Sequence, residues 1–430
     1  MNTMRVVVIG SGLMGVSTAW FLAKDGLDVT VLERADSAAQ GASFANAGML
    51  TPSMADPWNA PGTLMQMLRW IGNEDAPLLL RPRALPSLLG WGLSFLANSR
   101  PQRYRDNMER NLRLALYSLT VMRELRAALP LSYDQRTVGT LKVFHTPRAM
   151  DEAVQCCTQL VPLGLQMRTL DARQLSLFEP ALADVSASLA GGIHFPEDES
   201  GDARQFTEAL ARHAQAAGAI FRFGATVTGF ERDGARVTAV SVGAERLPAD
   251  AVVLAAGSWS PLLLRPLGLR LAVRPVKGYS VTLPLAGWKQ PPALPIIDDA
   301  LHAAVTPLGQ CLRVAGTAEF AGYDTAPTPA RIDNLFKLLL TIFPAFKAYL
   351  DETRAAPWAG LRPVSADGVP FIGQLGYDNL YVNTGHGHLG WTLAAGSARM
   401  LADLIQQRTP MLDPVPYRAQ RGLLSDRRRN

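Results

Sequence analysis

Residues 6–15 read VVVIGSGLMG, so that a β-branched run leads directly into three glycines at G-x-G-x-x-G spacing. A continuous apolar run of this kind is expected of a strand that is buried on both faces of a parallel sheet. Gly10 allows the tight turn, Gly12 lets the backbone approach a pyrophosphate, and Gly15 brings the following helix against the strand. Since the N-terminus of that helix offers N–H donors to phosphate, the stretch predicts a dinucleotide-binding βαβ unit.

A second predicted strand, residues 28–32, ends at Glu33, which lies 23 residues after Gly10. A carboxylate at this position accepts hydrogen bonds from the ribose hydroxyls of a dinucleotide. The same charge repels a 2′-phosphate, so that NADP is disfavoured and FAD or NAD remains. An ordinary βαβ turn without a ligand is the alternative interpretation.

Two later segments favour FAD. Residues 250–257 read DAVVLAAG, an apolar strand that ends in a small-residue turn, and residues 381–391 read YVNTGHGHLGW, a strand followed by a second glycine-rich helix start. An NAD enzyme has no need of a second glycine-rich helix start, which here lies 375 residues after the first. A reduced flavin carries negative charge at N1/C2=O, which a helix N-terminus stabilises.

Length and composition are those of a globular protein. The 430 residues allow roughly two or three domains, and the proportions of 48% apolar and 18% charged residues exclude general disorder.

The net charge of +5 lies almost entirely in residues 406–430, a basic C-terminal tail that carries six arginines and two aspartates. Because the rest is nearly neutral and shows no basic stripe, we predict no nucleic-acid partner.

Neither a metal site nor a membrane-spanning segment is expected. Cys156, Cys157 and Cys311 lack metal-ligand spacing and are predicted to be thiols, and the histidines outside residues 386–388 are scattered singly. The apolar stretch Leu85–Ala97 has 13 residues and contains a proline and two glycines, too short to span a bilayer. The N-terminal apolar run is too short for a signal peptide.

Longer motifs run through nearly the whole chain. They are SFANAG at 43–48, DPWNAP at 56–61, DESGD at 198–202, VKGYS at 276–280, GLRP at 360–363, DGVPFIG at 367–373 and NTGHGHLGWT at 383–392. With these stretches the chain strongly resembles the D-amino acid dehydrogenase family of the FAD-dependent DAO superfamily. The stretch from Pro410 onward carries no recognisable motif.

The resemblance implies an α/β, two-domain oxidoreductase. We expect a Rossmann-like FAD domain built from residues 1–58, 203–273 and 357–430, with an α+β substrate domain inserted as residues 59–202 and 274–356. It further implies oxidative deamination of a D-amino acid to the 2-oxo acid and ammonia, with hydride transfer from Cα to flavin N5. Electrons would leave to a quinone or another respiratory-chain acceptor, from a protein bound peripherally on the cytoplasmic side of the inner membrane. From its charge alone, and not from the resemblance, we expect the basic tail to help hold the protein on an anionic membrane, with Leu85–Ala97 as a second candidate contact.

Arg362 is the first candidate for substrate binding, because a guanidinium binds a carboxylate in bidentate fashion. The alternative is a structural ion pair at the domain junction. Tyr279, the second catalytic candidate, could contact the substrate or simply pack in a sheet, and we expect Lys277 to be solvated. The predicted cofactor-binding residues are Gly10, Gly12, Leu13, Met14, Gly15, Glu33, Arg34, Ser43, Asn46, Ala47, Gly48, Leu50, Val227, Gly257, Gly385, His386, Gly387, His388, Leu389, Gly390 and Thr392.

Several questions stay open at this level. No cysteine lies near the late flavin segments, so we predict non-covalent FAD. A D-hydroxyproline or D-proline dehydrogenase, an oxygen-using oxidase and a non-catalytic flavoprotein remain as alternatives. The sequence does not decide the preferred D-amino acid, the oligomeric state, or whether His386 or His388 contributes a catalytic side chain.

Overall fold

The strand β1 (Arg5–Ile9) lies at the centre of a six-stranded sheet, as its unbroken apolar sequence predicts. This computed structural model describes residues 3–72, 74 and 76–422. The strands lie in the order β19-β20-β13-β1-β2-β9, and all neighbours are parallel except β19 and β20. The other five strands are β2 (Asp28–Leu32), β9 (Ile220–Arg222), β13 (Ala251–Leu254), β19 (Phe371–Gln374) and β20 (Leu380–Thr384).

Alternate residues of β1 enter two different cores. Val6 and Val8 pack under a helical layer, whereas Val7 and Ile9 face a small antiparallel sheet on the other side. The helical layer consists of α1 (Leu13–Lys24), α4 (Pro101–Ala128), α8 (Ala203–Ala216) and α11 (Gly390–Ile405). The small sheet consists of β10 (Val227–Asp233), β11 (Arg236–Val242) and β12 (Glu245–Pro248).

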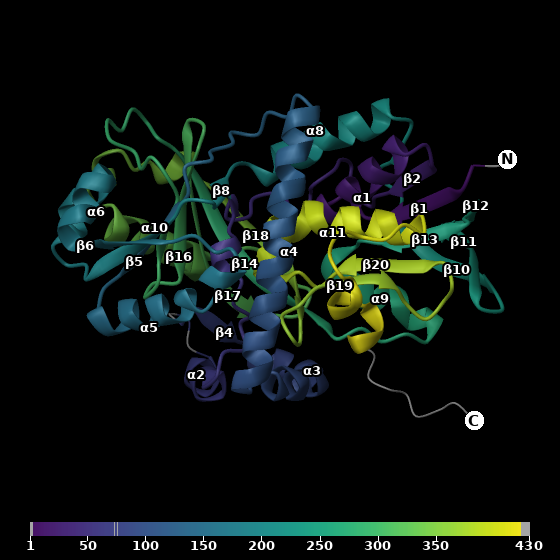
Figure 1. Ribbon diagram of the computed structural model, residues 1–430, viewed down its shortest axis with the longest axis horizontal. Helices are drawn as coiled ribbons and strands as arrows, with labels where there is room; N and C mark the ends of the chain where they lie inside the picture. The colour runs from purple at the N-terminus through teal and green to yellow at the C-terminus, as the bar shows by residue number, and fades with distance from the viewer. Residues whose placement is uncertain (1–2, 73, 75, 423–430) are drawn as a thin grey trace.

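A second, nine-stranded sheet forms the other half of the molecule (Figure 1). Its order is β18-β14-β17-β16-β15-β5-β7-β6, and β4 adds to the end of β17. The strands are β4 (Leu78–Leu80), β5 (Thr140–Phe144), β6 (Arg168–Asp171), β7 (Gly191–Phe195), β14 (Val273–Pro284), β15 (Ile296–Asp298), β16 (Ala303–Leu308), β17 (Cys311–Phe320) and β18 (Ala356–Ser365). This sheet is mixed, as expected for the inserted domain.

Helices cover the nine-stranded sheet, and further short elements join the two halves. One face packs on α10 (Pro329–Ile342). Part of the other face packs on α3 (Leu85–Ala97), and the part formed by β5 and β7 packs on α5 (Pro147–Thr158). The remaining elements are α2 (Thr63–Trp70), α6 (Ala172–Phe178), α7 (Ala183–Ser186), α9 (Ser260–Leu264), β3 (Met49–Leu50) and β8 (Glu199–Ser200).

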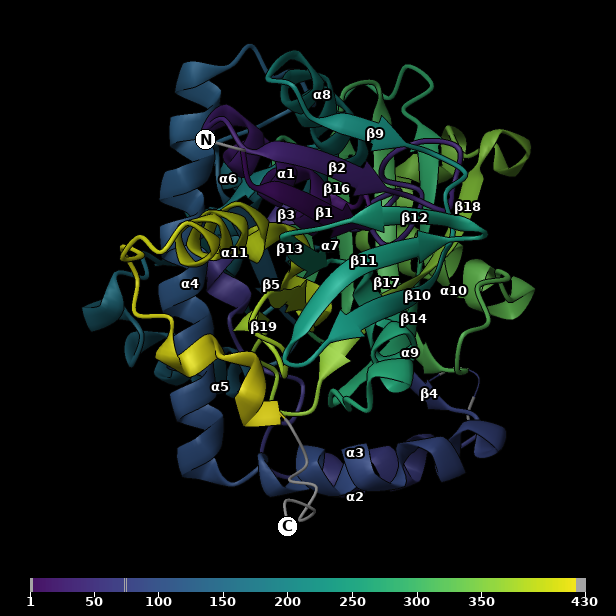
Figure 2. The same cartoon turned by 90° about the vertical axis from the view of Figure 1, so that its right-hand side faces the viewer.

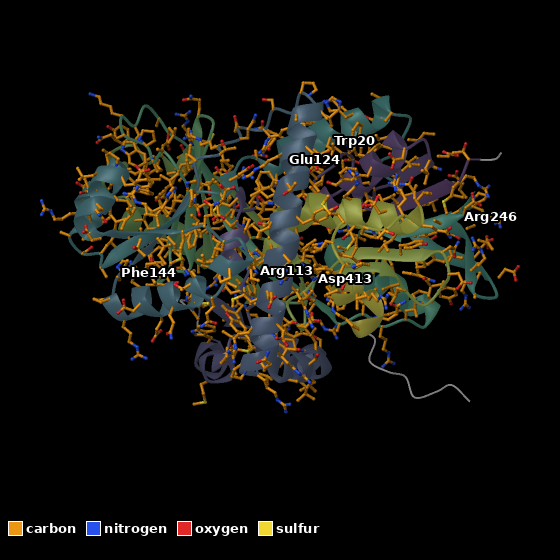
Figure 3. All side chains as sticks on the ribbon, in the orientation of Figure 1. Trp20, Arg113, Glu124, Phe144, Arg246 and Asp413 are labelled. Carbon is orange, nitrogen blue, oxygen red and sulfur yellow. The ribbon has the colours of Figure 1, made fainter. Side chains whose placement is uncertain are left out.

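Two elements differ from the expected segmentation. Strand β18 pairs along its whole length with β14, so residues 357–365 belong to the nine-stranded sheet rather than to the third FAD-domain segment. Helix α4 lies within the expected substrate segment, yet its buried face packs on α11 of the FAD domain. It crosses the front of the molecule with the exposed Arg113 and Glu124 on its outer side (Figure 3). Both differences arise from pairing between segments that are distant in sequence.

The predicted apolar stretch is α3, with the same bounds, and it lies beside α2 at one end of the molecule (Figure 2). Among the described residues, no helix combines the length and the apolar character that crossing a bilayer requires. The described part of the basic tail packs on the body, because Arg408 pairs with Asp25 and Arg421 pairs with Asp367. Arg427, Arg428 and Arg429 lie outside the described residues.

Candidate active site and cofactor cavity

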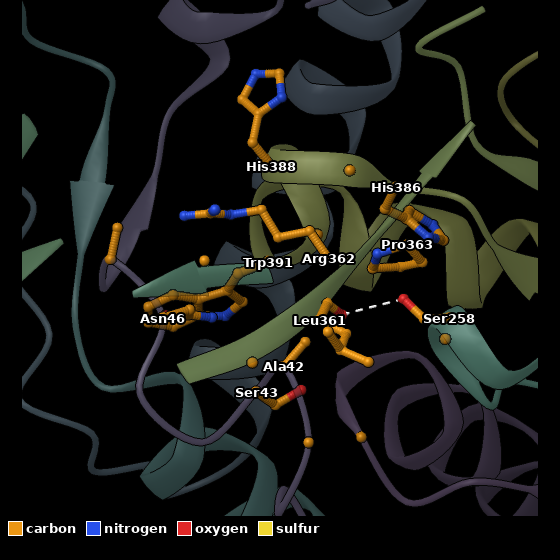
Figure 4. Close-up of a pocket in the computed structure, with 18 of the residues that line it drawn as sticks. Ala42, Ser43, Asn46, Ser258, Leu361, Arg362, Pro363, His386, His388 and Trp391 are labelled. Carbon is orange, nitrogen blue, oxygen red and sulfur yellow. Dashed lines mark hydrogen bonds between the residues drawn. The ribbon is translucent and has the colours of Figure 1, made fainter. Parts of the chain in front are cut away.

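A single large cavity of about 1000 Å³ is lined by both sheets. One end contains the glycine turn after β1, the middle contains residues 42–49, and the other end contains Arg362 and the turn before α11. This volume lies at the upper end of the range for ligand and cofactor sites. The segments that line it come from all parts of the chain, as Figure 4 shows for the region around Arg362.

At the dinucleotide end, two of the three glycines are required by close backbone contacts. A Cβ on Gly15 would lie 1.8 Å from the carbonyl oxygen of Gly10, and Gly10 itself has a φ of +103°. Gly12 itself provides no side-chain cap for helix α1, and the Leu13 amide at the helix start donates to the Ser43 hydroxyl at 3.1 Å. The partial positive charge of this helix start lies at the cavity wall, where it favours a phosphate. The Glu33 carboxylate accepts hydrogen bonds from the Ser11 amide at 2.8 Å and from the Ser11 hydroxyl at 3.0 Å, which fixes it beside the turn.

The central loop, residues 43–48, is held by the nine-stranded sheet. Ser280 donates to the carbonyl of Ala45 at 2.6 Å, Thr306 donates to that of Ala47 at 2.7 Å, and Arg313 donates to that of Asn46 at 3.3 Å. Sequence reasoning predicted the loop and missed these three donors. They lie on β14, β16 and β17, and no local pattern marks them.

The C-terminal glycine-rich turn leads into α11 as predicted. The helix has no side-chain cap at its N-terminus, and Gly387, Gly390 and Trp391 there line the cavity. Unpaired N–H groups and the partial positive charge of a helix start stabilise negative charge on a ligand. Thr392 lies one turn inside the helix, where its hydroxyl accepts a hydrogen bond from the Thr51 amide at 2.9 Å.

The Arg362 guanidinium lies in the cavity and forms no salt bridge to any carboxylate among the described residues. Its side chain crosses Gly278 so closely that a Cβ there would lie 2.0 Å from Nη1, and it lies 5.7 Å from the ring of Trp58. Burial lowers the pKa of Arg362 to about 10, which still leaves it charged at neutral pH. A charged guanidinium that lines the cavity and pairs with no carboxylate among the described residues is suited to an anionic ligand. The alternative of a structural ion pair therefore has no partner in the described part of the chain.

Tyr279 borders the cavity, but its side chain belongs to the core between β14 and α10. Its hydroxyl donates to Glu319 at 2.5 Å and lies 3.0 Å from the Thr328 hydroxyl. The predicted contact between Tyr279 and a substrate stays a prediction. Lys277, expected to be solvated, is instead fully buried, and its Nζ donates to Asp324 at 2.9 Å and to the carbonyl of Ala326 at 2.8 Å. The expectation for Lys277 was wrong because the loop after β17 folds over this face.

The structure brings most of the predicted site residues to the cavity wall. The predicted residues that do not line it are Gly15, Leu50, Gly385, Leu389 and Thr392, which support the wall from behind. Wall residues that sequence reasoning missed include Trp58, Lys142, Ser258 and His302. The buried hydroxyl of Ser258 donates to the carbonyl of Leu361 at 3.2 Å and thereby fixes the residue next to Arg362 (Figure 4).

These residues fit FAD. The backbone turn at Gly10–Gly15 would hold the pyrophosphate and Glu33 the adenosine ribose, with Val227 and Arg34 on the adenine side. Residues 43–48 and the start of α11 would hold the ring system. The fit rests on the Cβ-free cradle and on the two helix starts, those of α1 and α11, whose first residues line one cavity.

Comparisons with known proteins identify the family of the chain. The family model described as "FAD dependent oxidoreductase" (DAO) matches residues 5–404. A protein from Paramagnetospirillum magneticum named D-amino acid dehydrogenase is 45% identical over 94% of this chain and 96% of its own length. Another of that name, from Dechloromonas aromatica, is 44% identical over 95% of this chain and 98% of its own.

Solved structures show the same fold at low sequence identity. Glycine oxidase from Geobacillus kaustophilus gives a TM-score of 0.74 at 22% identity, covering 97% of this chain and 99% of its own. L-proline dehydrogenase from P. horikoshii gives a TM-score of 0.76 at 20% identity, and the match covers 99% of this chain and 100% of that protein's chain.

Proposed function

Because the chain belongs to the DAO family of FAD dependent oxidoreductases, we propose that it is a D-amino acid dehydrogenase. It oxidises a D-amino acid to the imino acid, which water hydrolyses to the 2-oxo acid and ammonia. The observation that carries the proposal is the Arg362 guanidinium, charged and without a described carboxylate partner, at one end of the cavity that fits FAD.

When bound, FAD supplies the acceptor for the hydride of the substrate Cα. The chain contributes binding and orientation. Arg362 binds the substrate carboxylate with two parallel hydrogen bonds, and its contact with Gly278 and the ring of Trp58 limits the positions that the guanidinium can take. Because the Arg362 guanidinium is buried, its charge acts in a medium of lower dielectric constant than water.

The cofactor is bound without a covalent link in this proposal. All three cysteines fall within the described residues, and none of them lines the cavity. Acid precipitation should therefore release the flavin into the supernatant. Flavin that stays with the polypeptide would contradict non-covalent binding.

The electron acceptor in this proposal is a quinone or another respiratory-chain component, reached by peripheral contact with the cytoplasmic side of the inner membrane. Support comes from α3, on which Leu89 and Leu93 are 69% and 71% exposed on one side, with the exposed Arg83 and Arg100 near its ends. Exposed apolar side chains flanked by arginines suit an anionic bilayer surface. Steady-state assays with a quinone analogue against oxygen distinguish a dehydrogenase from an oxidase.

The experiment that tests the function is anaerobic titration of the holoenzyme with single enantiomers. D-alanine should bleach the flavin absorbance, and L-alanine should leave it unchanged. Including cis-4-hydroxy-D-proline and D-proline in the panel tests the alternative of a hydroxyproline or proline dehydrogenase. Bleaching by none of the D-amino acids would reject the proposal.

A further inference from the structure

The two histidines of the turn before α11 have different surroundings. His386 is buried, with its Nε2 3.2 Å from the Ser397 hydroxyl and its Nδ1 enclosed without a partner. Burial lowers the pKa of His386 to about 3. His388 is half-buried and lies nearer the end of the Arg362 side chain, whereas His386 lies on the Pro363 side (Figure 4). Of the two, His388 is the one that can exchange a proton with a ligand.

Two contacts hold the His388 ring in one position. The ring stacks on Trp58 with centroids 5.5 Å apart and planes 13° from parallel, and its Nε2 lies 3.2 Å from the carbonyl oxygen of Met54. A carbonyl oxygen only accepts, so Nε2 must carry the proton. The neutral ring therefore keeps its lone pair on Nδ1.

The charged groups that face His388 come from two segments. Arg362 on β18 disfavours a proton on the ring, as does burial, so both lower the pKa of His388. The negative charge of Asp56, which lies in the same segment as Met54 and Trp58, raises the pKa of His388 instead. The result is a neutral imidazole next to the cation that binds the substrate carboxylate. Asp56 itself is exposed at the cavity wall.

The proposed oxidation needs a neutral base, such as the His388 imidazole, close to the substrate nitrogen. An amino acid at neutral pH carries an ammonium group, and its nitrogen has no lone pair for the new C=N bond until one proton has left. Two other candidates at the cavity wall are engaged in pairs: Asp299 with Lys142 at 2.7 Å, and Asp298 with His145 at 2.8 Å. His302 also lines the cavity, but the charged groups around it are Asp299, Lys142, Asp298 and Asp56, and Arg362 is not among them. Glu33 lies at the dinucleotide end.

We infer that His388 accepts the proton of the substrate ammonium group. One N–H bond of the substrate breaks as the Nδ1–H bond of His388 forms, and the nitrogen lone pair then forms the C=N bond while hydride leaves Cα. The proton passes from the half-buried His388 ring to solvent after the product has left. The inference rests on the proposed function and names a residue that this function did not require.

The test is the pH dependence of flavin reduction by D-alanine under anaerobic conditions, in wild type and in His388→Asn. General base catalysis contributes about 10²- to 10⁴-fold, so we expect a loss of that order at pH 7. The loss should shrink as the pH rises and the free amine becomes abundant. An equal loss at every pH, or no loss at pH 7, would overturn the inference. Absence of reduction in the wild type at every pH would instead reject the proposed function.

Two further measurements separate catalysis from folding. Binding of pyruvate, followed through the flavin spectrum, should be unchanged in His388→Asn, because Arg362 holds the carboxylate. Nitrogen chemical shifts of ¹⁵N-histidine wild-type holoenzyme should show His388 neutral at pH 7 with its proton on Nε2. This measurement needs no variant, and a proton on Nδ1 would overturn the assignment.

Discussion

Ser280 donates a 2.6 Å hydrogen bond to the carbonyl oxygen of Ala45, which lies 235 residues earlier in the chain. Ser280 lies on β14 of the nine-stranded sheet, whereas Ala45 belongs to the loop that follows the dinucleotide-binding unit. One buried hydrogen bond thus links the substrate-side sheet to the middle of the cofactor cavity. The shape of the cavity therefore depends on contact between the two halves.

Ser280→Ala tests this link. The substitution leaves the Ala45 carbonyl without its donor, a loss of about 1–3 kcal/mol, so we expect FAD to dissociate about 5- to 100-fold more readily. Fluorescence of released flavin during dialysis measures this. Ser188→Ala serves as the control, because it removes a hydrogen bond that an exposed hydroxyl donates to a backbone carbonyl at the surface. Equal flavin retention in both variants would show that the link does not hold the loop.

Arg362→Lys keeps the positive charge but removes the planar pair of donors. A hydrogen bond to a charged group contributes about 1.5–3 kcal/mol, so we expect kcat/KM for D-alanine to fall about 10- to 100-fold, with KM raised. The exposed Arg232→Lys is the matched control. Unchanged kinetics in Arg362→Lys would remove Arg362 from the substrate site.

Gly15→Ala should abolish cofactor binding, because the new Cβ would lie 1.8 Å from the Gly10 carbonyl oxygen. The turn and α1 must separate to accommodate it, which costs about 1–3 kcal/mol or more. The flavin-to-protein absorbance ratio and the Tm should both fall. At Gly229, on β10 and away from the cavity wall, a Cβ would meet no atom within 4 Å, so Gly229→Ala should retain the flavin. A yellow, stable Gly15→Ala protein would contradict the packing seen here.

Asp198 predicts a pH dependence of stability. Burial raises its pKa to about 7, although hydrogen bonds from Ser53 and Thr140 act in the opposite direction. An unfolded aspartate titrates near 3.9, so between about pH 4 and pH 7 the folded state binds the extra proton. The free energy of unfolding therefore falls as the pH rises through this window.

Asp198→Asn, which has the shape of the protonated acid, should lose that dependence. Its Tm should decrease less between pH 5 and pH 8 than the Tm of the wild type. Thermal denaturation followed by circular dichroism gives both curves, with the exposed Asp151→Asn as the control. Parallel curves for Asp198→Asn and wild type would show that Asp198 titrates normally.

Leu89→Gln/Leu93→Gln tests the membrane contact. A fully buried leucine contributes about 1.5–3 kcal/mol, so the double variant should lose at least about tenfold in sedimentation with phosphatidylglycerol vesicles. Leu177→Gln changes an equally exposed leucine on α6 and is the control. A truncated variant that ends at Gly422 lacks Arg427–Arg429, so its sedimentation measures the contribution of these arginines separately. If the double variant sediments like wild type, α3 is not the contact surface.

Sequence reasoning predicted the elements whose signals are local. The strand, glycine turn and helix at residues 5–24 and the second helix start near Gly390 are present as expected. The apolar stretch Leu85–Ala97, whose secondary structure was not predicted, is a helix. The sequence did not predict the position of a residue correctly where contact between distant segments determines that position. Residues 357–365 join β14 in the nine-stranded sheet, and Lys277 is buried because a loop 47 residues later folds over it.

The sequence by itself determined the dinucleotide-binding turn and the presence of Arg362, because both depend on residue type and on short spacing. Only the tertiary structure decided which side chains around them face the cavity. Tyr279 and Gly278 are neighbours in β14, yet Tyr279 enters the α10 core while Gly278 lies under the Arg362 guanidinium. His386 and His388 are two residues apart, and one is enclosed beside α11 while the other stacks on Trp58. The physical reason is that alternation along a strand or turn gives two possible faces, and only the packing of distant segments determines which face borders the cavity.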